Sequence, residues 1–311
     1  MKFIYVNTYG ARVRADSEII LIEKDGEKSY ISPRKGEVLI MGGGGSVSAG
    51  AIKVMAEHGM TFIIEDRGEI IAYMESPDFP YSTLESQMEM SPAWKMEIAR
   101  EMIISSARNR IEVLRKHGIK SDMKARIDRI RNSLSSEELM GAEGDFTREY
   151  FSHFRSLLKK ELGFERREKH PPRDPVNSML SYGYAILASK AIYAIKANGI
   201  SPRYGVLHAT YRNKTPMVYD FMEEFRGPIV DMAVLKMAKK AKMEDFTVEK
   251  DFCFIKEDFR KGLVESVFER LFAEMDYYGK KLALMDIMMY QAKVLKEAIE
   301  GREEYRGFRY A

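Results

Sequence analysis

Residues 205–231 combine one histidine with several carboxylates in the stretch GVLHATYRNKTPMVYDFMEEFRGPIVD. The Thr-Pro pair at 215–216 predicts a helix start, because proline at the first helical position gives up an N–H that has no helical partner. On that helix Asp220 lies one turn before both Glu223 and Glu224, so either pair shares a face. Two carboxylates facing the same way repel unless a cation or a proton lies between them. The stretch therefore has the composition of a metal site.

The same residues also have a purely structural interpretation. Glu223 can pair with Arg226 on a solvated helix face, and His208 can be a partly buried histidine without chemistry. The Gly-Pro pair at 227–228 is expected to interrupt the helix. A metal held by His208 and Glu223 needs another carboxylate, and Glu143 is the candidate, at the start of an amphipathic helix rich in aromatic residues. The helix dipole favours an acidic residue there in any case.

Length and composition indicate an ordinary globular protein of two domains. The chain has 311 residues, of which 45% are hydrophobic and 31% charged. No apolar run is long enough to span a bilayer, and the N-terminal MKFIYVNTYG lacks the layout of a secretory signal, so a cytoplasmic protein is expected. The single cysteine, Cys253, excludes an internal disulfide and a cysteine-based zinc cluster, and it is expected to be a core residue.

Charge is distributed unevenly along the chain. The first 80 residues hold 9 Lys/Arg and 12 Asp/Glu, which gives a net charge of −3, whereas the whole chain has a net charge of +3. The basic surplus therefore lies with the candidate site and is compatible with a polyanionic partner. The loop at 199–215 carries Arg203, Arg212 and Lys214, which either face solvent or contact phosphates.

The first eighty residues read as β-rich, and a compact sheet or sandwich is expected there. Asp25-Gly26 is a strong hairpin signal, and only residues 47–58 have a helical pattern, with Ser46 or Ser48 as the cap. The strands are expected at 3–6, 19–30, 38–41, 61–64 and 70–73.

Beyond Pro92 the apolar spacing becomes helical, and an almost all-α second domain is expected. The predicted helices span 94–116, 120–133, 142–162, 177–198, 216–241, 260–272 and 280–301. The domains are therefore predicted as a β-rich domain at 1–76, a linker at 77–92 and an α-helical domain at 93–311. The C-terminal tail alternates arginine with aromatic rings, which could stack on bases, but it is expected to dock on the helices or to be disordered.

Four motifs in order give the chain a resemblance to the CRISPR-associated integrase family, the metal-dependent nuclease-integrase of spacer acquisition. A Glu-Gly step precedes an aromatic-rich helix, a PRDPVNSMLSYGY segment follows, and then come a Gly-x-x-His motif and a DFMEEFRGP helix. These motifs lie at 143–151, 172–184, 205–208 and 220–228. The chain departs from the family pattern at Phe221, where leucine is usual, and at Gly227, which is inserted before the proline. Neither departure touches a proposed ligand.

The resemblance implies that Glu143, His208 and Glu223 are catalytic residues that bind the metal. Asp220 would then support a ligand from outside the coordination sphere or bind a second ion, and Glu224 has no assigned role. One imidazole and two carboxylates suit a hard divalent ion, Mg²⁺ or Mn²⁺, with open positions for substrate oxygens. A DNA phosphate held there could be attacked by water, which is nuclease cleavage, or by a 3′-hydroxyl, which is transesterification.

The resemblance also implies partners. It implies a homodimer formed through the β-rich domains, a small ferredoxin-like CRISPR-associated partner protein in a heterohexamer, and double-stranded prespacer and repeat DNA. The candidate DNA contacts are Arg148, Lys190, Arg203, Arg212, Lys214 and Arg226. Two other functions stay open at this point: a non-catalytic DNA-binding scaffold of a defence or repair complex, and a metal-dependent hydrolase of small phosphoesters.

Overall fold

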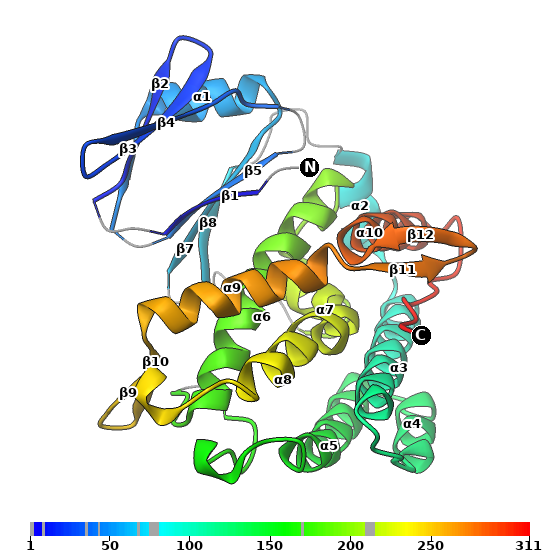
Figure 1. Cartoon of the computed structure of the whole chain (residues 1–311). Coiled ribbons are helices and arrows are strands. Elements are labelled where there is room, and N and C mark those ends of the chain that lie inside the picture. The colour runs from blue at the N-terminus through cyan, green and yellow to red at the C-terminus, as the bar shows by residue number, and fades with distance from the viewer. Residues whose placement is uncertain are drawn as a thin grey trace. The chain divides into compact units, whose positions relative to one another are not determined.

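The chain forms two compact units, residues 1–80 and 81–311. The computed structural model describes residues 3–7, 10–34, 37–42, 44–66, 69–74, 81–168, 171–208 and 215–311. The first unit is β-rich and the second is mostly helical, as the sequence predicts (Figure 1). No helix among these residues has the length and apolar character that crossing a membrane requires.

Two four-stranded sheets and helix α1 make up the described part of the first unit. One sheet has the order β1-β5-β7-β8, in which β8 alone runs antiparallel to its neighbour. The other has the order β4-β3-β2-β6. The bounds are β1 Phe3–Asn7, β2 Arg12–Asp16, β3 Ile19–Lys24, β4 Glu27–Ile31, β5 Val38–Gly42, β6 Ser46–Val47, α1 Ala49–Glu57, β7 Thr61–Asp66 and β8 Glu69–Tyr73.

The predicted hairpin and helix cap of this unit are confirmed. Strands β3 and β4 meet at Asp25 and Gly26, both with positive φ, which is the backbone of a two-residue hairpin turn. Ser48 caps α1 by accepting the backbone N–H of Ala51 at 3.1 Å. The sequence patterns missed β2, whose residues alternate between buried and exposed. Apolar side chains from both sheets and α1 form the core of this unit.

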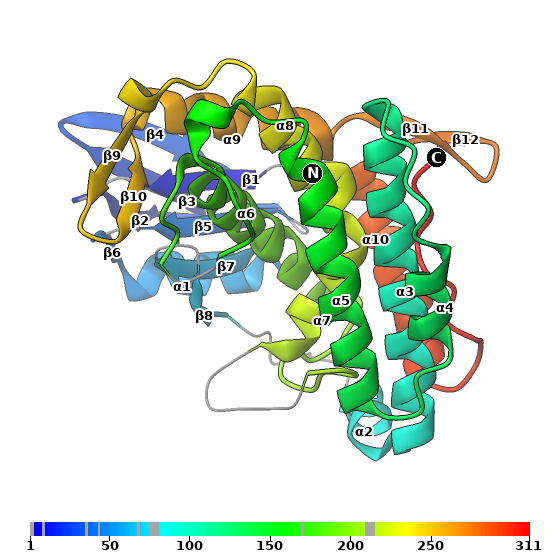
Figure 2. The same ribbon diagram turned by 90° about the horizontal axis from the view of Figure 1, so that it is seen from below.

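The second unit is built from helices with two short hairpins (Figures 1 and 2). Its helices are α2 Tyr81–Glu89, α3 Pro92–Lys116, α4 Lys124–Arg131, α5 Ser136–Arg155, α6 Pro175–Ala197, α7 Pro216–Phe225, α8 Met232–Ala238, α9 Glu257–Leu271 and α10 Leu284–Ile299. A π-helical segment, Arg226–Asp231, joins α7 to α8, and short 3₁₀ turns occur at Lys160–Leu162 and Met243–Asp245. The hairpins are β9 Phe246–Glu249 with β10 Phe252–Ile255, and β11 Glu274–Tyr277 with β12 Lys280–Ala283.

Proline at the first position starts several of these helices. α3 begins at Pro92 after Ser91, whose hydroxyl accepts the N–H of Trp94 at 3.2 Å. α6 begins at Pro175 after Asp174, whose carboxylate caps the helix in the same way. The predicted start of α7 at Pro216 is confirmed, although Thr215 makes no side-chain cap. Two parts of the predicted pattern differ: the predicted linker contains α2, and each hairpin interrupts a region expected to be α-helical or loop.

α6 is the central helix of the second unit. Nearly all of its residues are buried, and it contacts α7, α8, α9 and α10 (Figure 2). A helix that is apolar on every side belongs in a protein interior. Cys253, on the neighbouring strand β10, is buried as expected.

The C-terminal tail docks on the helices, as one of the two expectations had it. Phe308 is fully buried, and its ring stacks on that of Phe225 with centroids 5.0 Å apart. Tyr305 is buried as well, and Tyr310 donates its backbone N–H to Asn109 on α3 at 2.9 Å. The tail therefore contacts α7, the helix that carries the candidate site.

Candidate functional site

Asp220 organises the loop that precedes α7. Its buried carboxylate accepts the backbone N–H groups of Val206 at 2.8 Å and Leu207 at 3.0 Å. A Cβ at Gly205 would lie 2.7 Å from this carboxylate and 2.6 Å from the carbonyl oxygen of His208, so the loop can adopt this path only with glycine there. The Gly-x-x-His motif and the first acidic residue of α7 thus form one structural unit.

The same carboxylate orients the imidazole of His208. Nδ1 of His208 lies 2.5 Å from Oδ1 of Asp220. An ionised carboxylate only accepts hydrogen bonds, so Nδ1 carries the proton, and in the neutral imidazole Nε2 keeps its lone pair. The hydrogen bond to Asp220 raises the pKa of His208, against the opposing effect of burial, and the charges of Asp220 and Glu223 add to the rise. The His208 side chain is 49% exposed, so the ring is accessible from solvent.

Glu223 lies one turn after Asp220 and is bracketed by two arginines. Its Oε1 is 3.0 Å from Nη2 of Arg226, and its Oε2 is 3.5 Å from Nη2 of Arg110. The simple pairing of Glu223 with Arg226 is therefore present, but both side chains are largely buried rather than solvated. Two neighbouring guanidinium groups favour the charged form of a buried carboxylate, which is the form that binds a metal ion.

Arg110 on α3 connects this carboxylate to a second one. Its Nε lies 3.7 Å from Asp231, which also accepts hydrogen bonds from the hydroxyls of Tyr150 at 2.8 Å and Tyr184 at 2.5 Å. Burial alone would lower the pKa of Arg110, but the charges of Glu223, Tyr184, Asp231 and Tyr150 raise it overall. Burial raises the pKa of Asp231, and Arg110 and the two hydroxyls oppose that rise.

The π-helical segment allows one arginine to reach both carboxylates. Glu223 and Asp231 are eight positions apart, which in a regular α-helix would separate their directions by about 80°. A π-helical turn holds more residues, so each residue rotates less and the two side chains point closer together. A Cβ at Gly227 would lie 3.1 Å from Cγ of Arg110, so glycine also lets the two backbones approach. The expected interruption at Gly227-Pro228 is confirmed for the α-helix, which ends at Phe225, and the backbone continues as a π-helical turn.

Glu143, the third predicted ligand, lies on a different helix from Glu223. It lies on α5, where Thr147 donates its hydroxyl to Oε1 of Glu143 at 2.8 Å. It precedes Tyr150 by seven positions, which puts both on one helix face about 10 Å apart along the axis. No group of three His, Cys, Asp or Glu side chains in the described ranges is arranged to hold a metal ion. His208 is in contact with Asp220, and the charge of Glu223 acts on the same imidazole.

The predicted DNA contacts differ in accessibility. Arg148 is exposed and pairs with Asp145, and Arg203 is exposed in the loop before His208. The guanidinium of Arg226 lies 4.9 Å from the centre of the Tyr184 ring. Arg212 and Lys214 lie outside the described residues.

Lys190 does not fit a role in DNA binding. It is fully buried in α6, with its amino group 4.9 Å from the centre of the Phe268 ring. Its position follows from the apolar character of α6 on every side, which the sequence already displays.

Sequence reasoning missed Arg110, Asp231, Tyr150 and Tyr184 as neighbours of the site. The two tyrosines lie inside motifs that the resemblance matched, and Asp231 ends the stretch singled out first. Arg110 carries no such signal, because it lies on a helix far from the motifs in sequence.

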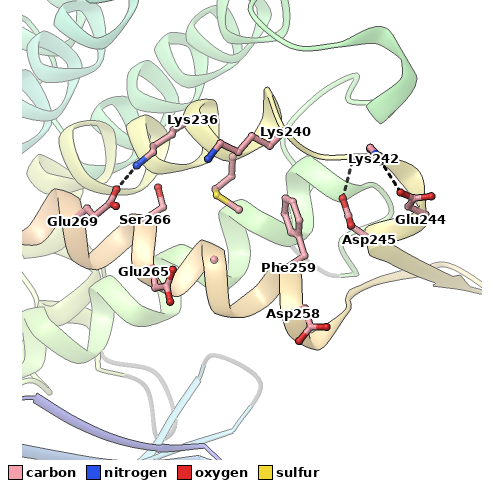
Figure 3. Close-up of a pocket in the computed structure, with 12 residues that line it drawn as sticks. Lys236, Lys240, Lys242, Glu244, Asp245, Asp258, Phe259, Glu265, Ser266 and Glu269 are labelled. Atoms are coloured by element: carbon pink, nitrogen blue, oxygen red, sulfur yellow. Dashed lines mark hydrogen bonds and ion pairs between the residues drawn. The ribbon is translucent and has the colours of Figure 1, made fainter.

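A surface pocket lies elsewhere, between α8, α9 and the turn that follows α8 (Figure 3). Two of its lysines pair with glutamates that also line it: Lys236 with Glu269, and Lys242 with Glu244. The pocket contains none of the predicted site residues.

Comparison with known proteins identifies relatives of this chain. Residues 4–269 match the model of the family described as CRISPR associated protein Cas1. The chain is 29% identical to the CRISPR-associated endonuclease Cas1 1 of Methanospirillum hungatei over 333 aligned positions, which cover 100% of this chain and 99% of that protein.

Solved structures show the same fold. A Cas1 protein from Thermotoga maritima gives a TM-score of 0.86 at 18% identity, with 99% of this chain and 100% of that chain covered. A casposase bound to its integration product gives a TM-score of 0.86 at 22% identity, with 100% and 95% covered. Because the family model matches most of its length, this chain belongs to the Cas1 family of CRISPR-associated proteins.

Proposed function

We propose that this protein is a divalent-metal-dependent DNA endonuclease and integrase that inserts DNA fragments into a CRISPR array. The observation that carries the proposal is the Asp220–His208 pair at the start of α7. Metal-binding histidines usually donate their other ring N–H to a carboxylate, which fixes the tautomer and the direction of the ring. His208 has this arrangement, and its Nε2 is left for a metal ion.

The donor set supports a hard divalent cation, Mg²⁺ or Mn²⁺. An imidazole nitrogen and carboxylate oxygens suit these ions, and the imidazole makes Mn²⁺ especially acceptable. His208 and Glu223 would hold the ion, and Glu143 is proposed as the third ligand. The three side chains have to converge on one point for this, because no three candidate ligands among the described residues are yet arranged to hold an ion.

A bound ion would polarise a DNA phosphate and stabilise the charge that develops in an in-line displacement. The chain's own residues would do the rest. Asp220 keeps His208 in one tautomer and fixes the loop backbone of 205–208. Arg226 lies beside Glu223 with a guanidinium suited to a phosphate oxygen. Attack by water cleaves DNA, and attack by a DNA 3′-hydroxyl joins the fragment to its target.

The proposed assembly follows from family membership. It has a homodimer formed through the β-rich units, a small ferredoxin-like partner and prespacer DNA bound across the complex. Arg148, Arg203, Arg212, Lys214 and Arg226 remain the proposed DNA contacts, and Lys190 is withdrawn because it is buried.

His208→Ala tests the proposal. The variant is incubated with branched or prespacer DNA and Mn²⁺, and cleavage and joining products are separated on a gel. We expect loss of both products together with weaker Mn²⁺ binding by calorimetry, because a ligand is missing. His153→Ala, which changes a histidine on α5 away from Asp220, is the matched control and should behave as the parent.

Two outcomes would overturn the assignment. Equal product from His208→Ala and the parent would show that the imidazole is not needed for the reaction. DNA binding without metal-dependent product from the parent protein would instead favour a non-catalytic scaffold.

A further inference from the structure

The docked C-terminal tail buries its aromatic side chains and exposes its arginine side chains. Tyr305 and Phe308 are buried, whereas Arg306 and Arg309 are exposed. The backbone between them is held in place, because Gln291 donates its side-chain N–H to the carbonyl oxygen of Arg306 at 2.6 Å. The tail thus displays two guanidinium groups from a fixed backbone.

Both groups lack a carboxylate partner. Four arginines in the described part of residues 81–311 have side chains that make no hydrogen bond or ion pair with another residue: Arg108, Arg260, Arg306 and Arg309. Three of these four lie together. Arg306 and Arg309 line one surface pocket, and Arg309 lies close enough to Arg108 on α3 for their charges to repel. We call Arg108, Arg306 and Arg309 the arginine patch.

The two carboxylates at this pocket are engaged with the backbone. Glu101 accepts the N–H of Gly307 at 3.4 Å, and Asp276 accepts the N–H of Gly279 at 3.1 Å. Neither forms an ion pair with the patch. Burial and then the charge of Arg309 lower the pKa of Arg108, and the charge of Glu101 opposes part of this effect. Two lysines of the pocket in Figure 3 differ from the patch, because Lys236 and Lys242 pair with glutamates there.

An exposed aromatic ring borders the patch. Tyr278 lines the same pocket at the tip of the β11–β12 hairpin, and it is 79% exposed. Its φ is +52°, a conformation that bulky residues rarely adopt and that asparagine, aspartate or glycine normally fills in such turns. Backbone strain of this kind is kept where the side chain has a use. Here it presents an aromatic face beside unpaired arginines.

We infer that the arginine patch and Tyr278 form a binding site for a single-stranded segment of nucleic acid. Guanidinium groups bind phosphate oxygens in a two-pronged geometry, and bases stack on exposed tyrosine rings. The combination favours a nucleic acid over an acidic protein surface, which would need no exposed ring. The site involves the tail and α3, and it contains none of the proposed metal ligands.

The inference rests on the proposed function in taking DNA as the polymer. Its test therefore avoids catalysis. Binding of fluorescein-labelled single-stranded DNA to the full chain is measured by anisotropy in EDTA, at several salt concentrations, for the parent and for Arg306→Gln/Arg309→Gln. We expect roughly tenfold weaker binding of the variant near 100 mM salt, and a slope of log K against log salt reduced by about 1.4, since two phosphate contacts are lost.

Arg260→Gln/Arg302→Gln is the matched control, because it removes the same charge from an unpaired and a paired arginine outside the patch. It should keep the parent affinity and slope. Tyr278→Ala should weaken single-stranded binding about tenfold while duplex binding changes little, because only unpaired bases can stack on the ring.

Several results would overturn the inference. One is parental DNA binding by the patch variant, and another is an equal loss in the control. A third is unchanged DNA binding with lost binding of polyglutamate, which would identify an acidic protein surface as the partner. If His208→Ala loses integration but binds single-stranded DNA as the parent does, the DNA-binding site at the arginine patch and the proposed metal site are independent of each other.

Discussion

Two consecutive glutamates on α7 have opposite surroundings. Glu223 lies between the guanidinium groups of Arg110 and Arg226, next to a half-exposed imidazole. Glu224 is fully buried and is held by neutral donors, the hydroxyl of Tyr305 and the backbone N–H of Phe308, both at 2.7 Å. Burial raises the pKa of Glu224 to about 8, and the two hydrogen bonds only partly oppose the rise.

The different surroundings of Glu223 and Glu224 show that two residues of the same type on this helix can have different roles. A carboxylate kept charged by arginines near solvent can exchange a guanidinium for a metal ion. A carboxylate that burial drives toward neutrality instead serves as an anchor, here for the C-terminal tail. We therefore propose a catalytic role for the face of α7 that carries Asp220 and Glu223, called the chemical face below, and a structural role for Glu224.

Of the three substitutions on α7, we expect Glu223→Gln to have the largest effect on activity. Glutamine keeps the size but loses the charge, so we expect metal-dependent DNA cleavage to fall by roughly two orders of magnitude or more. Gel assays with Mn²⁺ measure this, and Glu224→Gln is the matched control. A similar loss in both variants would show that the two faces do not differ in function.

Asp220→Asn should have an intermediate effect. The amide can donate to His208 as well as accept, so the imidazole loses its fixed tautomer and the loop loses part of its support. Replacement of such a supporting carboxylate typically costs about 10- to 100-fold in metal affinity or activity. Calorimetry with Mn²⁺ and the gel assay together measure it. Unchanged metal affinity would mean that His208 needs no orientation.

Glu224→Gln should leave cleavage within about twofold and instead change how stability depends on pH. The folded-state pKa of Glu224, about 8, lies above its ordinary value, so the folded protein holds an extra proton between these two limits. The contribution of Glu224 to the free energy of unfolding of the parent therefore decreases by roughly 1 kcal/mol per pH unit as the pH rises from the ordinary pKa of glutamate to the folded-state pKa.

Glutamine does not titrate, so the melting temperature of Glu224→Gln should depend less on pH between about 5 and 8 than that of the parent. Thermal melts in a series of buffers measure the difference. Parallel pH profiles for parent and variant would contradict the assigned environment of Glu224.

The sequence motifs predicted the residues of the chemical face of α7 better than the residues from other helices that contact them. Gly205, His208 and the acidic residues of α7 are neighbours in sequence, so local reasoning and a family resemblance find them together. Arg110 comes from α3, and only tertiary packing brings it to Glu223. The role of Glu143 stays a prediction of the resemblance, because the described contact of its side chain is the hydrogen bond from Thr147 on its own helix.

The hairpin β3–β4 was predicted from its turn residues, whereas the hairpin β11–β12 was missed. Asp25-Gly26 predicts a turn because both residues tolerate positive φ, and the turn is there. Tyr278-Gly279 has the same backbone, but tyrosine gives no such signal, and the residues after it continue a helical apolar pattern. The strand β12 was therefore expected to be the first turn of a longer helix. Local propensity fails here at a position with an unusual backbone.

The π-helical segment accommodates one extra residue without changing the rotational phase of the helix that follows it. Because each residue of a π-helical turn rotates less than a residue of an α-helix, loss of one residue, such as Gly227, would let α7 and α8 merge into a continuous α-helix in which α8 keeps nearly its present direction. The buried side chains of α8 would then stay against α9. The chain can therefore differ in length by one residue at this point while both flanking helices keep their neighbours.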